Sequence, residues 1–202
     1  MLWAVLVVWL ASAGTGLAWL MTYDNTPGTP ANAPSGWPAG SALARDTAGP
    51  TLVMLAHPRC DCTRASIGEL AELLARAPRR PRTFIVFLRP GNVPAAWEKT
   101  STFDQATRIP GVTVIRDGGN EAVRFGVSTS GQTLLYDRDG QLVYSGGITG
   151  ARGKSGSNTG RSTLLQLLAG EHPDRATTQV FGCSLFSWLK GETKTPGDAN
   201  GS

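Results

Sequence analysis

Between residues 51 and 168 the chain alternates short apolar runs with amphipathic stretches, and this pattern limits its fold more than any other feature. Residues 51–56 (TLVMLA) and 83–88 (TFIVFL) carry no charge and are almost wholly apolar, which is the pattern of strands buried on both faces of a sheet. Between them, four apolar residues recur at the spacing of one helix face in a stretch that runs to Arg76. Two such strands joined by a helix indicate a crossover connection within one sheet.

The remainder of the region continues this alternation. The further expected elements are, in chain order, an irregular helix, a strand, a helix, two hairpin strands and a last helix: 93–109, 112–115, 120–125, 133–136, 141–145 and 162–168. The hairpin turn DRDG (137–140) supplies the glycine that a tight turn needs. Strands joined first by crossovers and then by a tight turn predict an α/β fold, with a mixed central sheet flanked by helices.

Two cysteines lie where the first buried strand passes into its helix, in the sequence HPRCDC (57–62). A cysteine reacts as its thiolate, and the free N–H groups at a helix start stabilise that anion. We therefore expect a lowered pKa for at least one of these two thiols. We expect Cys60 to attack a disulfide and Cys62 to resolve the mixed disulfide, with His57 as the candidate proton carrier.

The third cysteine, Cys183, lies in the hydrophobic stretch VFGCSLF (180–186), after the last expected helix. Two interpretations of it stay open. A lone free cysteine is often a small buried apolar side chain. Alternatively, the C-terminal extension folds back, and Cys183 acts as a second resolving thiol.

This order of elements, with cysteines at the first strand–helix junction, resembles the thioredoxin-like superfamily over about Pro50 to Leu168. The residues that carry the resemblance are TLVMLAHPRCDCTRASIGEL and FGVSTSGQTLLYDRDGQLVYSGGI. The combination of HPRCDCT and FGC is similar to proteins labelled RedB-like. The resemblance implies a thioredoxin-like fold and a substrate-contact loop at Ser130, Gly131 and Gln132. The chain departs from the family in having one residue between its thiols instead of two, and Gln132 where a cis-proline usually precedes the threonine.

The N-terminal segment bears on the compartment. Residues 2–21 carry no charge, and a helix of that length spans about 30 Å of hydrocarbon. We expect residues 1–23 to be a single-pass transmembrane anchor, with a signal peptide cleaved near Ala11–Ala13 as the alternative. Residues 24–50 are expected to be a Pro/Gly-rich tether, 51–189 the thioredoxin-like domain with a C-terminal extension, and 190–202 a disordered tail. The domain would face the periplasm or another extracytoplasmic space.

Three functions use the same cysteines. The first is thiol–disulfide exchange with an unidentified thiol or disulfide protein, which would make the chain a thiol–disulfide oxidoreductase. The second is the handling of copper or another soft metal, because Cys60, Cys62 and His57 offer two sulfurs and one imidazole. The third is a redox-inactive binding module. We expect exchange without a cofactor and without a bound metal.

Nucleic acid is not an expected partner. The 19 Lys and Arg residues against 15 Asp and Glu give a net charge of only +4, and the basic residues are scattered along the chain. The sequence GITGARGKS (147–155) lacks the glycine spacing of a phosphate-binding loop. We expect it to be a surface loop close to the redox centre.

Overall fold

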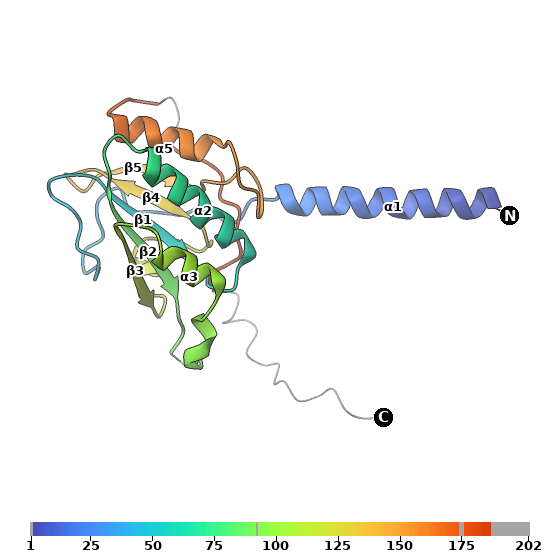
Figure 1. The fold of residues 1–202 in the computed structure, drawn as a ribbon, viewed down its shortest axis with the longest axis horizontal. Coiled ribbons are helices and arrows are strands. Elements are labelled where there is room, and N and C mark those ends of the chain that lie inside the picture. Colours follow the sequence, from blue (N-terminus) through green and yellow to red (C-terminus); the bar gives the residue numbers. More distant parts are fainter. Residues whose placement is uncertain (1, 92, 174–175, 187–202) are drawn as a thin grey trace.

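A computed structural model describes residues 2–91, 93–173 and 176–186. Five strands form one mixed sheet in the order β3-β2-β1-β4-β5 (Figure 1). The strands are β1 (Thr51–Ala56), β2 (Arg82–Leu88), β3 (Val112–Asp117), β4 (Thr133–Tyr136) and β5 (Leu142–Gly146). The first three are parallel, whereas β4 is antiparallel to both β1 and β5. The expected strands and the mixed sheet are therefore confirmed, and the central β1 is buried along its whole length.

Three helices cover one face of the sheet (Figure 1). They are α2 (Asp61–Arg76), α3 (Ser101–Thr107) and α5 (Thr159–Ala169), with the short 3-10 helix η1 (Ala95–Glu98) preceding α3. Alternate β1 residues, Leu52 and Met54 among them, pack against this layer. Helix α5 begins three residues before the expected start, because the Asn158 side chain accepts a hydrogen bond from the Arg161 N–H (2.8 Å) and caps it.

The opposite face is covered by the short helix α4 (Asn120–Arg124) and by segments without regular structure. Leu43 and the Trp37 ring belong to this second core, and Trp37 lies edge-on against Phe125 and Tyr136 with centroids 5.2 Å from each. Part of the segment expected to be a Pro/Gly-rich tether is therefore packed on the domain. The physical reason is that α4 is too short to cover the sheet, so apolar side chains between the prolines complete the layer.

Helix α1 (Leu2–Asn25) extends away from the domain (Figure 1). It has no buried residue and is the one described helix long and apolar enough to cross a membrane. The expected tail at 190–202 lies outside the described residues. The chain therefore consists of an α/β domain, an N-terminal segment packed on it, and an apolar helix that leaves it.

Candidate thiol redox site

Cys60 is the residue that precedes the first turn of α2, directly after the loop that follows β1. Its backbone is extended (φ −105°, ψ 115°) and its N–H donates to the carbonyl oxygen of His57 (3.2 Å). The residue is only 1% exposed. The strand–helix junction thus places this thiol at a helix N-terminus, as the sequence predicts, and inside the protein.

The C-terminal segment brings Cys183 to the same place. Residues 183–185 run antiparallel to residues 128–130: the Ser130 N–H donates to the Cys183 carbonyl (2.9 Å), and the Leu185 N–H donates to the Ser128 carbonyl (2.8 Å). The two sulfur atoms of Cys60 and Cys183 lie 2.8 Å apart. Cys183 itself is exposed, so the interpretation as a buried apolar side chain is wrong and the extension does fold back.

This contact controls the ionisation of both thiols. The pKa of Cys60 is lowered to about 4, above all because the Cys183 S–H donates to its sulfur. The Thr63 hydroxyl and the N–H groups of Cys183 and Thr63 act in the same direction, whereas burial opposes them. The pKa of Cys183 is raised, because its proton is held by the Cys60 thiolate. The expected lowered pKa is confirmed, but its main cause is the Cys183 thiol, and the N–H groups named in the prediction contribute less.

A chain of hydroxyl groups supports the Cys60 thiolate. The Ser130 Oγ accepts a hydrogen bond from the His57 N–H (2.7 Å) and lies 2.6 Å from the Thr63 Oγ1. Because Thr63 donates to the Cys60 sulfur, its oxygen is free to accept from the Ser130 hydroxyl. Ser130 therefore holds Thr63 in the orientation that stabilises the thiolate.

The expected contact loop at 130–132 does lie beside Cys60, but its residues are enclosed. Ser130 and Gln132 are buried, and the N–H of Gly131 and the carbonyl of Gln132 pair with Leu55 at the end of β1 (2.7 and 3.0 Å). Gly131 has φ +87°, and a Cβ there would press on the Ser66 hydroxyl. On its other side, the backbone of this loop pairs with residues 183–185 of the same chain.

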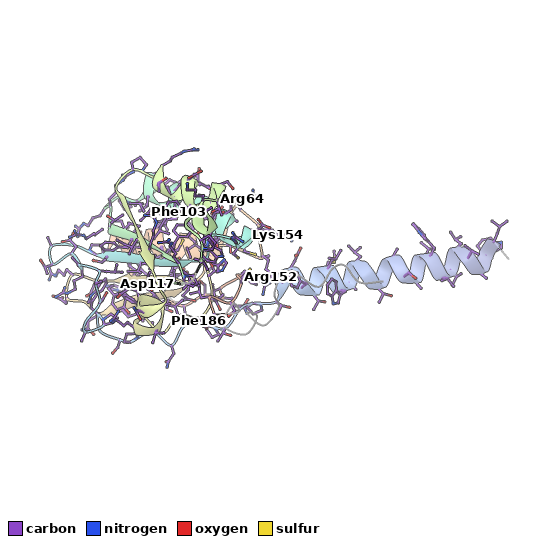
Figure 2. All side chains as sticks on the ribbon, turned by 90° about the horizontal axis from the view of Figure 1, so that it is seen from below. Arg64, Phe103, Asp117, Arg152, Lys154 and Phe186 are labelled. Atoms are coloured by element: carbon purple, nitrogen blue, oxygen red, sulfur yellow. The ribbon has the colours of Figure 1, made fainter. Side chains whose placement is uncertain are left out.

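Cys62 is the second residue of α2 and is partly exposed. Burial and the charge of Cys60 raise its pKa, and Arg152 opposes them. Arg152 also donates from Nη1 to the Gly182 carbonyl (2.9 Å), next to Cys183, and its guanidinium lies 5.0 Å from the ring centre of Tyr23 in α1. Figure 2 shows Arg152 beside the end of α1 that joins the domain.

The sequence predicted that the 147–155 loop lies close to the redox centre, and Arg152 confirms this. The sequence did not predict that Arg152 contacts the redox site, because no local pattern separates it from the other scattered arginines. The part of Thr63 was also missed. Its position in the first turn of α2, close to Cys60, was the signal that could have identified it.

His57 lies close to Cys60. Among the hydrogen bonds of the described residues, none joins the His57 ring to the Cys60 sulfur. Its Nδ1 accepts from the Arg59 N–H (3.2 Å), and its ring lies edge-on against Trp97. Burial lowers the pKa of His57, and the Cys60 thiolate counteracts this. Among the described residues no group of three or more His, Cys, Asp or Glu side chains is arranged to hold a metal ion.

No protein-family model and no curated protein sequence matches the chain. Solved structures do. A hypothetical protein from Sinorhizobium meliloti aligns with TM-score 0.59 and 19% identity, over 78% of this chain and 97% of that one. An uncharacterized conserved protein from Geobacillus kaustophilus aligns with TM-score 0.60 and 18% identity, over 79% and 96%.

A secreted disulfide oxidoreductase from Mycobacterium tuberculosis aligns less closely, with TM-score 0.43 and 15% identity over 62% of this chain and 83% of that one. At these identities, similarity extends to the fold alone. The topology of the chain itself, a β1-α2-β2 crossover followed by a β4-β5 hairpin and α5, is the thioredoxin-like arrangement that the sequence resemblance implies.

Proposed function

We propose that this chain, whose fold is thioredoxin-like, is a membrane-anchored thiol–disulfide oxidoreductase in which Cys60 and Cys183 form the reversible disulfide. The observation that carries the proposal is the 2.8 Å separation of their sulfur atoms at a helix N-terminus, where the Cys183 thiol and nearby donors stabilise Cys60 as a thiolate. Two thiols become one disulfide, and the two electrons and two protons reduce a disulfide of the partner protein to two thiols.

Cys183 is a better candidate than Cys62 for the partner of Cys60. The Cys183 sulfur already lies 2.8 Å from the sulfur to which it must bond. Cys62 also has a hydrogen bond with Cys60, but that bond is a minor cause of its raised pKa, and Arg152 interacts with the same thiol. In this proposal Cys62 is an auxiliary thiol, and Cys183 takes its place as the partner of Cys60 in the disulfide.

Disulfide mapping of the full chain in mild detergent tests the proposal. After equilibration in glutathione buffers of increasing reduction potential, we expect a single two-electron transition whose product is a Cys60–Cys183 disulfide. Cys62→Ala should keep this transition, whereas Cys60→Ala and Cys183→Ala should each abolish it. Loss of the transition in Cys62→Ala would instead identify the Cys-x-Cys pair as the redox couple. If no variant or potential yields a disulfide, thiol exchange is refuted.

The natural partner in this proposal is a thiol or disulfide protein in an extracytoplasmic compartment, because disulfides persist there. His57 is proposed as a proton carrier for exchange, since its lowered pKa keeps the imidazole neutral at pH 7 and able to accept a proton. Replacing His57 by Gln should slow exchange with the partner and leave the reduction potential nearly unchanged, since a proton carrier alters a rate and not an equilibrium.

A further inference from the structure

We infer that a partner's thiol exchanges with Cys183 and not with Cys60, and that residues 182–185 form an arm that passes oxidising equivalents between the buried thiol and the partner. This inference rests on the proposed function. It adds the point of contact with the partner, which is the C-terminal arm rather than the cysteine at the helix start.

Exposure is the first observation behind this inference. Cys60 is 1% exposed, whereas Cys183 is an exposed residue. An attacking thiolate must approach a disulfide along the line of its two sulfur atoms. In a Cys60–Cys183 disulfide, the sulfur that a protein partner can approach from solvent is therefore that of Cys183.

The arm covers Cys60 because it is fixed at several points. Its backbone pairs with residues 128–130 through the two hydrogen bonds of the Thr129–Ser184 bridge. Arg152 binds the Gly182 carbonyl from the other side, and Leu185 is buried in the second core. The peptide groups of the arm thus occupy the edge along which an extended segment of a partner would otherwise reach Cys60.

The leaving group gives the second, chemical argument. A disulfide is cleaved faster when the departing sulfur has a low thiol pKa. Attack at Cys183 expels Cys60 as a thiolate that the Thr63 hydroxyl and the N–H groups of Thr63 and Cys183 still stabilise, although the Cys183 sulfur is then bonded to the partner and no longer donates to it. Attack at Cys60 would expel Cys183, whose thiolate is disfavoured by burial and by Cys62. Accessibility and leaving-group stability therefore favour the same sulfur.

The exchange balances in two steps. A thiolate of a partner dithiol bonds to the Cys183 sulfur, the Cys60–Cys183 bond breaks, and Cys60 leaves as a thiolate. The second partner thiol then loses its proton to solvent and bonds to the first partner sulfur, so that the partner becomes a disulfide and Cys183 leaves as a thiolate that takes up a proton. The partner is oxidised, the chain is reduced, and the reverse sequence reduces a partner disulfide.

Trapping of the mixed disulfide tests the inference, with glutathione as the probe. The full-length Cys62→Ala chain in mild detergent is oxidised, and its Cys60–Cys183 bond is verified by mass spectrometry. It is then mixed with glutathione for less than one turnover, quenched with acid and alkylated. We expect glutathione on Cys183 and the alkyl group on Cys60. Glutathione on Cys60 would overturn the inference while leaving the proposed function intact, whereas absence of the starting bond would remove both.

A glycine in the arm provides a second test. A Cβ at Gly182 would collide with the Ser130 carbonyl, so Gly182→Ala must displace the arm. Gly150 is exposed with nothing within 4 Å of such a Cβ, which makes Gly150→Ala the matched control. For reduced protein we compare Cys60 alkylation by a bulky and a small maleimide, because the ratio of the two rates is insensitive to the pKa of the thiol.

The ratio of bulky to small reagent should rise several-fold in Gly182→Ala and stay at the native value in Gly150→Ala. An unchanged ratio in Gly182→Ala would mean that the arm does not shield Cys60, and the inference would fail.

Discussion

The thiolate of Cys60 depends on a donor 123 residues away in the sequence. Two neutral thiols at contact distance would gain little from each other, because S–H is a weak donor to a neutral acceptor. Once Cys60 is ionised, the hydrogen bond becomes charge-assisted and the proton remains on Cys183. The pair is therefore best described as one thiolate and one thiol, which is the state from which a disulfide can form.

Removal of the donor should make Cys60 a weaker acid. A hydrogen bond to a charged group is worth about 1.5–3 kcal/mol, so Cys183→Ala should raise the pKa of Cys60 from about 4 by about 1–2 units. The measurement is the ultraviolet absorbance of the thiolate against pH, in a Cys62→Ala background where Cys60 is the one thiol left. The Cys62→Ala variant is the control and should keep the low midpoint. Equal midpoints in the two proteins would contradict the assigned cause.

At the scale of elements, the loop that carries Arg152 is held by a buried carboxylate of α2. Glu69 is 3% exposed and accepts hydrogen bonds from the Gly156 N–H (2.6 Å), from the Asn158 side chain (3.0 Å) and from Arg161. The carboxylate therefore fixes the start of α5 and the end of the loop at once. It is an anchor for the redox site that lies outside the site itself.

Breaking this buried pair should be costly. Glu69→Ala leaves the Arg161 guanidinium largely buried without its partner, and we expect a loss of about 3–5 kcal/mol in the free energy of unfolding. Glu72→Ala, on the same helix, breaks a pair with Arg76 in which both side chains are more than half exposed, and should cost less than about 1 kcal/mol. Urea unfolding followed by fluorescence measures both. A similar cost for the two variants would show that Glu69 is no anchor.

The segment before β1 is an element of the core in spite of its composition. Trp37 lies edge-on against Phe125 and Tyr136, and large-to-small replacement of such a ring costs about 3–5 kcal/mol where it is well packed. Because Trp37 is partly exposed, we expect about 2–3 kcal/mol for Trp37→Ala, read as a lower midpoint of thermal unfolding. A tether free of the domain would leave that midpoint unchanged.

Local patterns explain why most elements were predictable. The apolar runs of β1 and β2 and the helical period of α2 each lie within a few consecutive residues, and the DRDG turn fixes the hairpin. The docking of Trp37 and of Cys183 depends on surfaces contributed by residues about a hundred positions away. No periodicity in 24–50 or 180–186 encodes those contacts, so the surface on which Trp37 packs was not predicted and the position of Cys183 stayed open.

For the whole molecule, the redox site lies at the face of the domain from which α1 leaves. Arg152, which lies beside the domain end of α1 (Figure 2), connects the two. Its backbone N–H donates to the Asp24 carbonyl (3.0 Å), its guanidinium lies over the Tyr23 ring, and its Nη1 donates to the Gly182 carbonyl beside Cys183. A partner that reaches the arm must therefore do so close to the start of the domain. If α1 spans a membrane, exchange takes place near the bilayer surface.

Helix α1 has properties that fit a segment inside a membrane. The hydroxyl groups of Ser12, Thr15 and Thr22 each donate to the carbonyl four residues earlier (2.8, 2.5 and 2.9 Å), so they need no water inside a bilayer. Trp19 and Tyr23 stack at the domain end (6.1 Å between centroids), where aromatic rings favour the lipid–water boundary. The fold does not depend on cleavage, because the contacts of Tyr23 and Asp24 lie after the alternative site at Ala11–Ala13.

We therefore expect the full chain to stay in the membrane with its domain outside the cytoplasm. The intact mass of the protein from washed membranes should include residues 1–13. After reduction of intact spheroplasts of a Gram-negative host with a membrane-impermeant reductant, which opens the Cys60–Cys183 bond, a membrane-impermeant maleimide should label Cys183, because Cys183 is exposed. The Cys183→Ser variant shows how much label other cysteines take up. A soluble product that lacks residues 1–13 would establish a cleaved signal peptide, and labelling that requires lysis would place the domain in the cytoplasm, where a structural or catalytic disulfide of this kind would be kept reduced.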